Sequence, residues 1–115
     1  MKSREVKKLL FDVQEGCALI MKFTEGRTLD QYVKDRMLQS AVERQAEIIG
    51  EALRQAAVLE ASLADEIPEL RRIIALRNRL AHGYADISPE IVWGIAADDV
   101  PKLLTEVRAV MGDSL

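Results

Sequence analysis

The sequence predicts an all-α protein, an antiparallel bundle of four to five helices that forms one domain over residues 1–115. Apolar residues recur at three- and four-residue intervals through most of the chain, and helix start and stop signals separate these segments. No stretch alternates apolar and polar residues as a half-buried strand would. A chain of 115 residues is long enough for one hydrophobic core and too short for two.

The composition is that of an ordinary folded domain with a slightly acidic charge. Hydrophobic residues make up 49% and charged residues 30%, and the formal net charge is -3. Aromatic residues make up only 4%, so side chains on which single-stranded bases could stack are scarce. Any affinity for RNA would therefore have to come mainly from charge and shape.

The chain shows no signal for export or membrane insertion. Charged residues interrupt the apolar positions after the N-terminus, and no apolar run approaches the length of a membrane span. The single Cys17 cannot form an internal disulfide, which is typical of a reducing cytoplasm. One cysteine and one histidine, His82, cannot build a closed zinc site. We therefore predict a cytoplasmic protein without a metal or cofactor, although carboxylate-bound magnesium stays compatible with the sequence.

Two helices are predicted in the first half of the chain. The first runs from about Ser3 to Thr24, with Cys17 on its apolar face as a core residue, not a nucleophile. Gly26 and Arg27 break the pattern. The stretch 28–31 then has the form of a capping box, so a second and longest helix is predicted to start near Leu29.

The second half is predicted to hold the remaining helices. Residues 61–67 read as a loop, and Pro68 suits the first turn of a third helix that Gly83 would end. Ser88 and Pro89 have the form of an N-cap followed by proline at the first helical position, which predicts a fourth helix. Pro101 is expected to kink or restart that helix.

The residues with chemical potential gather in one stretch, Arg-Asn-Arg-Leu-Ala-His-Gly-Tyr at positions 77–84. Between positions 71 and 85 the chain has four arginines and no acidic residue, although the whole chain is acidic. This basic island indicates an anionic ligand. The arginines with the potential to contact an RNA backbone, outside the pair discussed next, are Arg71, Arg72 and Arg79.

Arg77 and His82 together are typical of phosphate chemistry, because histidine exchanges protons near neutral pH and arginine stays charged. Residues five apart differ by about 140° around a regular helix, so the two side chains share a face only if the helix ends between them. Alternatively, each meets its counterpart from a second copy across a two-fold axis. A plainer interpretation is a solvated arginine face, a histidine that caps the helix, and a half-buried Tyr84.

The spacing Arg-x4-His-x-Tyr, formed by Arg77, His82 and Tyr84, resembles the signature of HEPN-domain proteins of the HepT toxin family. The stretch 48–52, Ile-Ile-Gly-Glu-Ala, is similar to part of that family's long second helix, and residues 88–93 resemble its final helical region. The resemblance extends from about position 32 to position 104, in order.

The resemblance implies a HEPN-like fold and a metal-independent endoribonuclease toxin that acts as a homodimer, with the motifs of both protomers in one cleft. It further implies neutralisation by an MNT-type nucleotidyltransferase antitoxin. Arg77 and His82 would be catalytic, with Asn78 as a polar companion, and Tyr84 would be the tyrosine that the antitoxin adenylylates.

A rival function belongs to a different class: a non-catalytic helical module that binds a nucleotidyltransferase or a nucleotide. The same arginines would then hold phosphate without cleaving it. The acidic charge of the chain favours this rival, because general nucleic-acid binders are usually basic. A dimer cleft, however, would concentrate the basic island of both copies. A purely structural bundle is the third interpretation.

Overall fold

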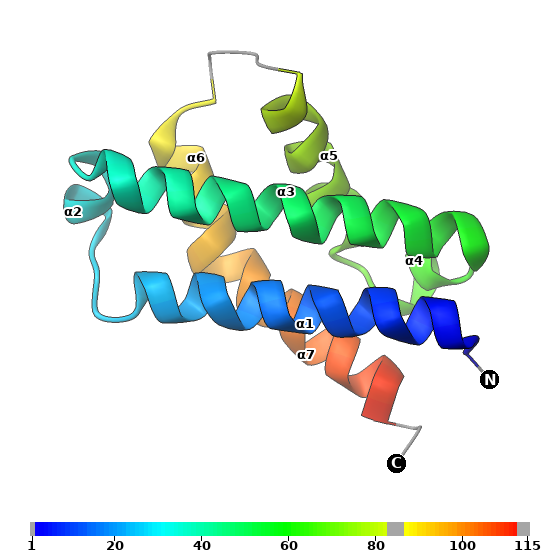
Figure 1. The fold of residues 1–115 in the computed structure, drawn as a ribbon. Coiled ribbons are helices and arrows are strands. Elements are labelled where there is room, and N and C mark those ends of the chain that lie inside the picture. Colours follow the sequence, from blue (N-terminus) through cyan, green and yellow to red (C-terminus); the bar gives the residue numbers. More distant parts are fainter. Residues whose placement is uncertain (1, 83–86, 113–115) are drawn as a thin grey trace.

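The protein is described by a computed structural model that covers residues 2–82 and 87–112. Every regular element in those two ranges is helical, which confirms the all-α fold class (Figure 1). The elements are α1 (Arg4–Thr24), α2 (Leu29–Val33), α3 (Arg36–Leu59), α4 (Leu63–Glu66), α5 (Leu70–Ala81), α6 (Pro89–Gly94), the π-helical turn η1 (Ile95–Asp99) and α7 (Val100–Gly112). Over these residues no helix has both the length and the apolar character needed to cross a membrane.

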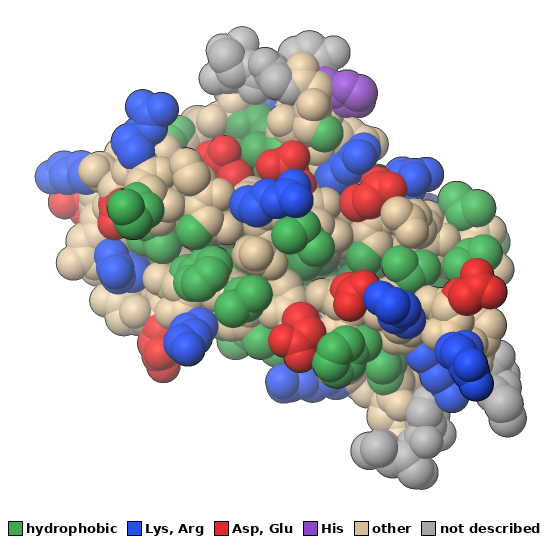
Figure 2. Space-filling view, in the orientation of Figure 1, with side chains coloured by type: hydrophobic (Ala, Val, Ile, Leu, Met, Phe, Trp, Pro, Cys, Tyr) green, Lys and Arg blue, Asp and Glu red, His purple; other side chains and the backbone are tan. Residues whose placement is uncertain are grey.

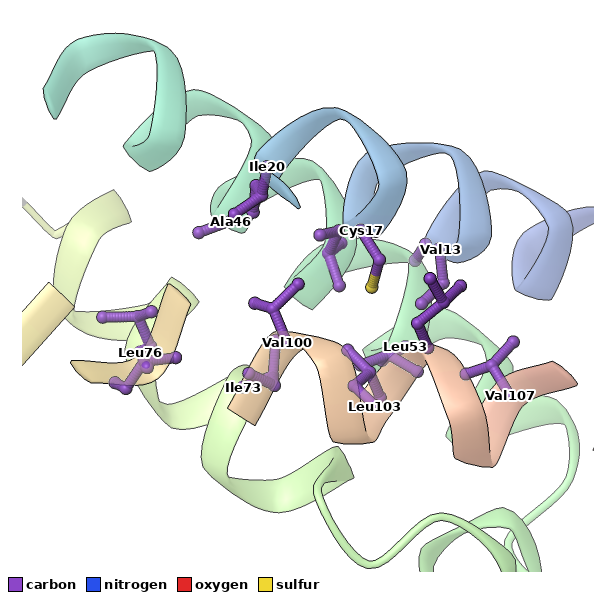
Figure 3. Close-up of a cluster of buried hydrophobic side chains, with 14 of the residues drawn as sticks. Val13, Cys17, Ile20, Ala46, Leu53, Ile73, Leu76, Val100, Leu103 and Val107 are labelled. Carbon is purple, nitrogen blue, oxygen red and sulfur yellow. The ribbon is translucent and has the colours of Figure 1, made fainter. Parts of the chain in front are cut away.

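The two long helices α1 and α3 lie side by side and antiparallel, and they form the frame of the bundle (Figure 1). Helix α5 packs against α3, and α7 packs against α1. Apolar side chains from these four helices meet in one core (Figure 3). Helix α3 contacts both α1 and α5. The packing of α3 in the core therefore fixes the position of α5, the helix that carries the motif.

The second helix differs from the prediction, because it is two helices. The capping box at Thr28 and Gln31 is present, and Gly26 adopts the left-handed conformation that ends the preceding turn. However, α2 ends after one turn. Asp35 then caps α3, because its side chain accepts a hydrogen bond from the Leu38 backbone N–H at 3.0 Å. The continuous apolar spacing concealed this second cap.

The connection between α3 and α5 also differs from the prediction. Residues 61–67, expected to be a loop, contain the short helix α4. Pro68 lies in the turn before α5 and not in its first helical turn, because α5 begins at Leu70. Leu63 and Ile67 are fully buried in this segment, so burial of apolar side chains stabilises a structure that loop-like spacing did not suggest.

The last helical region begins as predicted and continues without a break. The Ser88 side chain accepts a hydrogen bond from the Ile91 backbone N–H at 3.2 Å, and Pro89 occupies the first helical turn. Pro101 lies in the first turn of α7, which begins at Val100, so an α-helix restarts beside the proline as expected. The π-helical turn η1 directly precedes α7, and its wider turn accommodates a ring that would otherwise clash with the carbonyl four residues earlier.

Cys17 lies in the core, which confirms its structural role. Its side chain points between α1, α3 and α7 (Figure 3), and it is fully buried. Burial raises the pKa of the Cys17 thiol to about 12, because the apolar surroundings disfavour the thiolate.

We predict that Cys17 of the native protein does not react with a thiol reagent at pH 8, because neither access nor thiolate is available. In denaturant the thiol should react at the rate of a cysteine in a short peptide. Mass spectrometry after a timed pulse of iodoacetamide measures both rates. Fast labelling of the native protein would contradict the packing of α1 in the core.

Candidate active site

Helix α5 ends where the motif histidine begins. The last helical residue is Ala81, and His82 is the C-cap, with its backbone N–H donating to the Asn78 carbonyl at 3.2 Å. The His82 side chain is exposed (purple in Figure 2). Gly83 and Tyr84 lie outside the described residues, so the predicted glycine cap and modification site stay predictions.

The stem of Arg77 packs against a glycine of the neighbouring helix. A Cβ atom added at Gly50 of α3 would lie 2.2 Å from the Arg77 Cβ and 3.2 Å from the Ile73 carbonyl oxygen. Real side chains do not approach so closely, so only glycine permits this crossing of α3 and α5. The contact therefore determines where the Arg77 side chain leaves α5.

The guanidinium of Arg77 has two protein contacts at its outer nitrogens. One terminal nitrogen, Nη2, lies 3.1 Å from Glu51 Oε1, and the other, Nη1, donates to Asn78 Oδ1 at 3.1 Å. The predicted companion Asn78 does contact Arg77. The contact with Asn78 is a hydrogen bond, whereas the contact with Glu51 is an ion pair that is not aligned as a hydrogen bond.

Glu51 is the centre of a small polar network on α3. Arg54 donates to both of its carboxylate oxygens, Nε to Oε1 at 3.0 Å and Nη2 to Oε2 at 2.8 Å, and Gln55 donates to Oε2 at 2.9 Å. The hydrogen bond from Arg54, followed by that from Gln55 and by the charges of Arg54 and Arg77, lowers the pKa of the Glu51 carboxyl to about 2. Glu51 therefore stays ionised far below neutral pH.

A groove of about 480 Å³ opens beside Arg77, between α1 and α3. Its charged lining mixes signs: Lys8, Arg44 and Arg77 alternate with Asp12, Glu47 and Glu51. The space-filling view shows the same mixture over the face formed by α1 and α3, with no continuous basic surface (Figure 2). One copy of the chain therefore offers local positive charge at Arg77 and not a broad electrostatic track.

The three arginines predicted to contact RNA differ in their surroundings. Arg71 and Arg79 are exposed on α5. Arg72 is also exposed, but its Nε lies 2.8 Å from Oδ2 of the buried Asp99 in η1, in an ion pair that is not aligned as a hydrogen bond. Arg72 therefore links α5 to η1, which makes it the weakest of the three candidates for an RNA contact.

Gly50 and Glu51 lie in the stretch 48–52 that resembles the family's long second helix, but the sequence assigned neither residue a contact with Arg77 and did not single out Arg54 or Gln55. The available signal was local: a glycine inside a helical pattern, followed by a glutamate with arginine and glutamine three and four residues later. What could not be derived was that this turn of α3 faces Arg77.

Comparison with known proteins gives one family and several relatives that match most of the chain. A model of the family described as "Ribonuclease HepT-like" matches residues 13–110. A protein of Methanocaldococcus jannaschii named "Putative RNase" is 32% identical over 115 residues, 98% of this chain and 93% of that protein. Another of the same organism and description is 33% identical over 112 residues, 96% of this chain and 100% of that protein.

A protein of Thermococcus cleftensis named "Probable ribonuclease HepT" is 33% identical over 100 residues, which cover 87% of this chain and 90% of that protein. No solved structure gives a significant match. The fold and the motif define a small helical bundle that presents arginine, asparagine and histidine at the end of one helix. The family match identifies it further: the chain belongs to the HepT-like ribonuclease family.

We predict that Gly50→Ala lowers the free energy of unfolding by about 1–3 kcal/mol, because the added methyl group overpacks the crossing of α3 and α5. Gly94→Ala is the matched control, since an added Cβ there meets nothing within 4 Å and alanine is the better helix former. Urea unfolding followed by circular dichroism measures both variants. Equal stability of the two would contradict the close contact at Arg77.

Proposed function

We propose that this protein is a metal-independent endoribonuclease toxin of a toxin–antitoxin pair. The observation that carries the proposal is the oriented guanidinium of Arg77 on the helix that ends at His82, in a chain of the HepT-like ribonuclease family. Family membership makes RNA the expected substrate class. Arginine and histidine supply the charge stabilisation and proton transfer that cleavage of a phosphodiester requires.

In the proposed reaction, neutral His82 of one protomer takes the proton of a ribose 2′-hydroxyl, and the 2′-oxygen attacks the adjacent phosphorus. Arg77, held by Asn78 and Glu51, stabilises the negative charge of the phosphorane. The bond from phosphorus to the 5′-oxygen breaks, and the protonated His82 of the second protomer gives its proton to that oxygen. The products are a 2′,3′-cyclic phosphate and a 5′-hydroxyl.

The division of labour between two copies of His82 requires a homodimer, which is part of the proposal. Helix α5 ends at Ala81, between Arg77 and His82, so the separation of about 140° in a regular helix does not by itself decide whether one copy brings the two side chains together. Across a two-fold axis each site could combine residues of both copies. Large apolar side chains exposed on the long helices, such as Phe11 and Met37, offer surface for such an association.

Regulation is proposed to act on Tyr84, two residues beyond His82. A nucleotidyltransferase antitoxin of the MNT type would transfer an adenylyl group to its hydroxyl, with release of pyrophosphate from ATP. The added phosphate and nucleoside would block RNA at the cleft by charge and by volume. No rearrangement of the bundle is needed for this inhibition.

We predict that the purified, unmodified protein cleaves a mixed RNA pool in excess chelator and leaves cyclic phosphate ends, whereas His82→Ala leaves the RNA intact. End-group analysis of the fragments checks the mechanism, and mass spectrometry confirms that Tyr84 carries no nucleotide. Equal activity of the parent and His82→Ala would overturn the mechanism. Intact RNA with both proteins would favour the non-catalytic binding module.

We predict that Tyr84→Phe remains a ribonuclease when a nucleotidyltransferase of the MNT type and ATP are added, whereas the parent loses its activity. Removal of the hydroxyl removes the acceptor of the adenylyl group. RNA cleavage and intact mass, measured on both proteins before and after incubation, test this. An equal loss of activity by Tyr84→Phe would show that modification of this tyrosine is not the mechanism of inhibition.

A further inference from the structure

We propose that Glu51 is a positioning residue that holds the Arg77 guanidinium in the orientation required by the reacting phosphate. Nothing in the Arg-x4-His-x-Tyr motif includes Glu51, which lies on a different helix, 26 positions earlier in the chain. The expected effect of Glu51 on the rate of cleavage rests on the proposed ribonuclease function. The immobilisation of Arg77 by Glu51 does not depend on that function and can be tested without RNA.

The contacts that carry the proposal act at both ends of the Arg77 side chain. Gly50 admits the stem, and the next residue of α3, Glu51, lies 3.1 Å from the terminal Nη2. Asn78 accepts a hydrogen bond from Nη1, so one terminal nitrogen has a hydrogen bond and the other an ion pair. The Arg77 side chain is only 26% exposed, which shows that most of it lies against protein.

Glu51 can orient Arg77 because it is itself held. Arg54 binds both carboxylate oxygens and Gln55 binds one of them, so the carboxylate cannot rotate without the loss of several hydrogen bonds. A long arginine side chain on a protein surface otherwise samples many rotamers, and its immobilisation by substrate would reduce the rate. The network supplies that immobilisation before RNA binds.

The same network leaves Arg77 able to act on an anion. A guanidinium carries five N–H donors, so the contacts with Glu51 and Asn78 leave most of them available to phosphate oxygens. One carboxylate also lies between the two positive charges of Arg54 and Arg77, so the trio keeps a net positive charge. Glu51 should therefore orient Arg77 while its negative charge weakens the attraction for RNA. Loss of Glu51 should then slow turnover without weakening RNA binding, which distinguishes a positioning residue from a binding residue.

The matched control is Glu47, one turn earlier on α3. It lines the same groove and carries the same charge, and among the described residues it has no hydrogen bond or ion pair. Replacement of either glutamate by alanine removes one negative charge from the groove. Only Glu51→Ala removes a contact with Arg77.

The first test measures the mobility of Arg77 without RNA. Nitrogen-15 relaxation of the Arg77 Nε–H, assigned by its absence in Arg77→Lys, should report a rigid side chain in the parent protein and in Glu47→Ala. In Glu51→Ala the heteronuclear NOE should fall toward that of an exposed arginine, because fast side-chain motion becomes possible. An unchanged NOE in Glu51→Ala would overturn the proposal, whether or not the protein cleaves RNA.

The second test separates turnover from binding in RNA cleavage. Glu51→Ala should lower kcat about 10- to 100-fold, as expected for a displaced catalytic group, with KM unchanged or lower. Glu47→Ala should change KM in the same direction and leave kcat as in the parent. A rise in KM with unchanged kcat in Glu51→Ala would contradict positioning.

A double-variant comparison shows whether Glu51 acts through Arg77. Glu51→Ala combined with Arg77→Ala should be no slower than Arg77→Ala alone, because a group without its target has nothing to orient. Multiplication of the two losses would overturn the proposal and assign Glu51 a separate role. Absence of cleavage by the parent would refute the proposed function, and the relaxation measurement would then decide the role of Glu51 by itself.

Discussion

The close approach of α5 to α3 at Gly50 determines the geometry of the candidate site. Because Gly50 has no side chain, the Arg77 stem lies directly on the backbone of α3. The next residue, Glu51, is then close enough to form an ion pair with the Arg77 guanidinium. The packing of α3 on α1 through the common core fixes α3 in turn. A surface arginine therefore has a defined position because a helix crossing, and not its own rotamer preference, limits where it lies.

The positive charge of the site is confined to the surroundings of Arg77, whereas the molecule as a whole is acidic. The net charge is -3 and the groove beside Arg77 mixes acidic and basic side chains, so attraction of a polyanion to one copy is weak over long distances. An arginine that already contacts Glu51 and Asn78 suits recognition of one phosphate better than adhesion to many. In one copy of the chain the site therefore offers a local attraction for phosphate and not an extended one.

The sequence predicted the fold class and the positions of most helices because apolar spacing and capping residues are local signals. The Ser88 and Thr28 caps lie where they were expected. The errors share one cause. The spacing of apolar residues continues across Asp35, and the loop-like stretch 61–67 contains the short helix α4. Both outcomes depend on what packs against the segment, which one sequence does not reveal.

The arginines of α5 illustrate the same limit at the site. Arg71, Arg72, Arg77 and Arg79 are chemically identical, and spacing alone separates only Arg77, through its relation to His82. Their surroundings single out two of them: Arg72 pairs with Asp99 of η1 and Arg77 with Glu51 of α3, whereas Arg71 and Arg79 are both exposed. Each partner comes from a different helix. The role of an arginine is thus set by the residue that tertiary packing places opposite it, and the Gly-Glu pair of α3 is what distinguishes Arg77 from its neighbours.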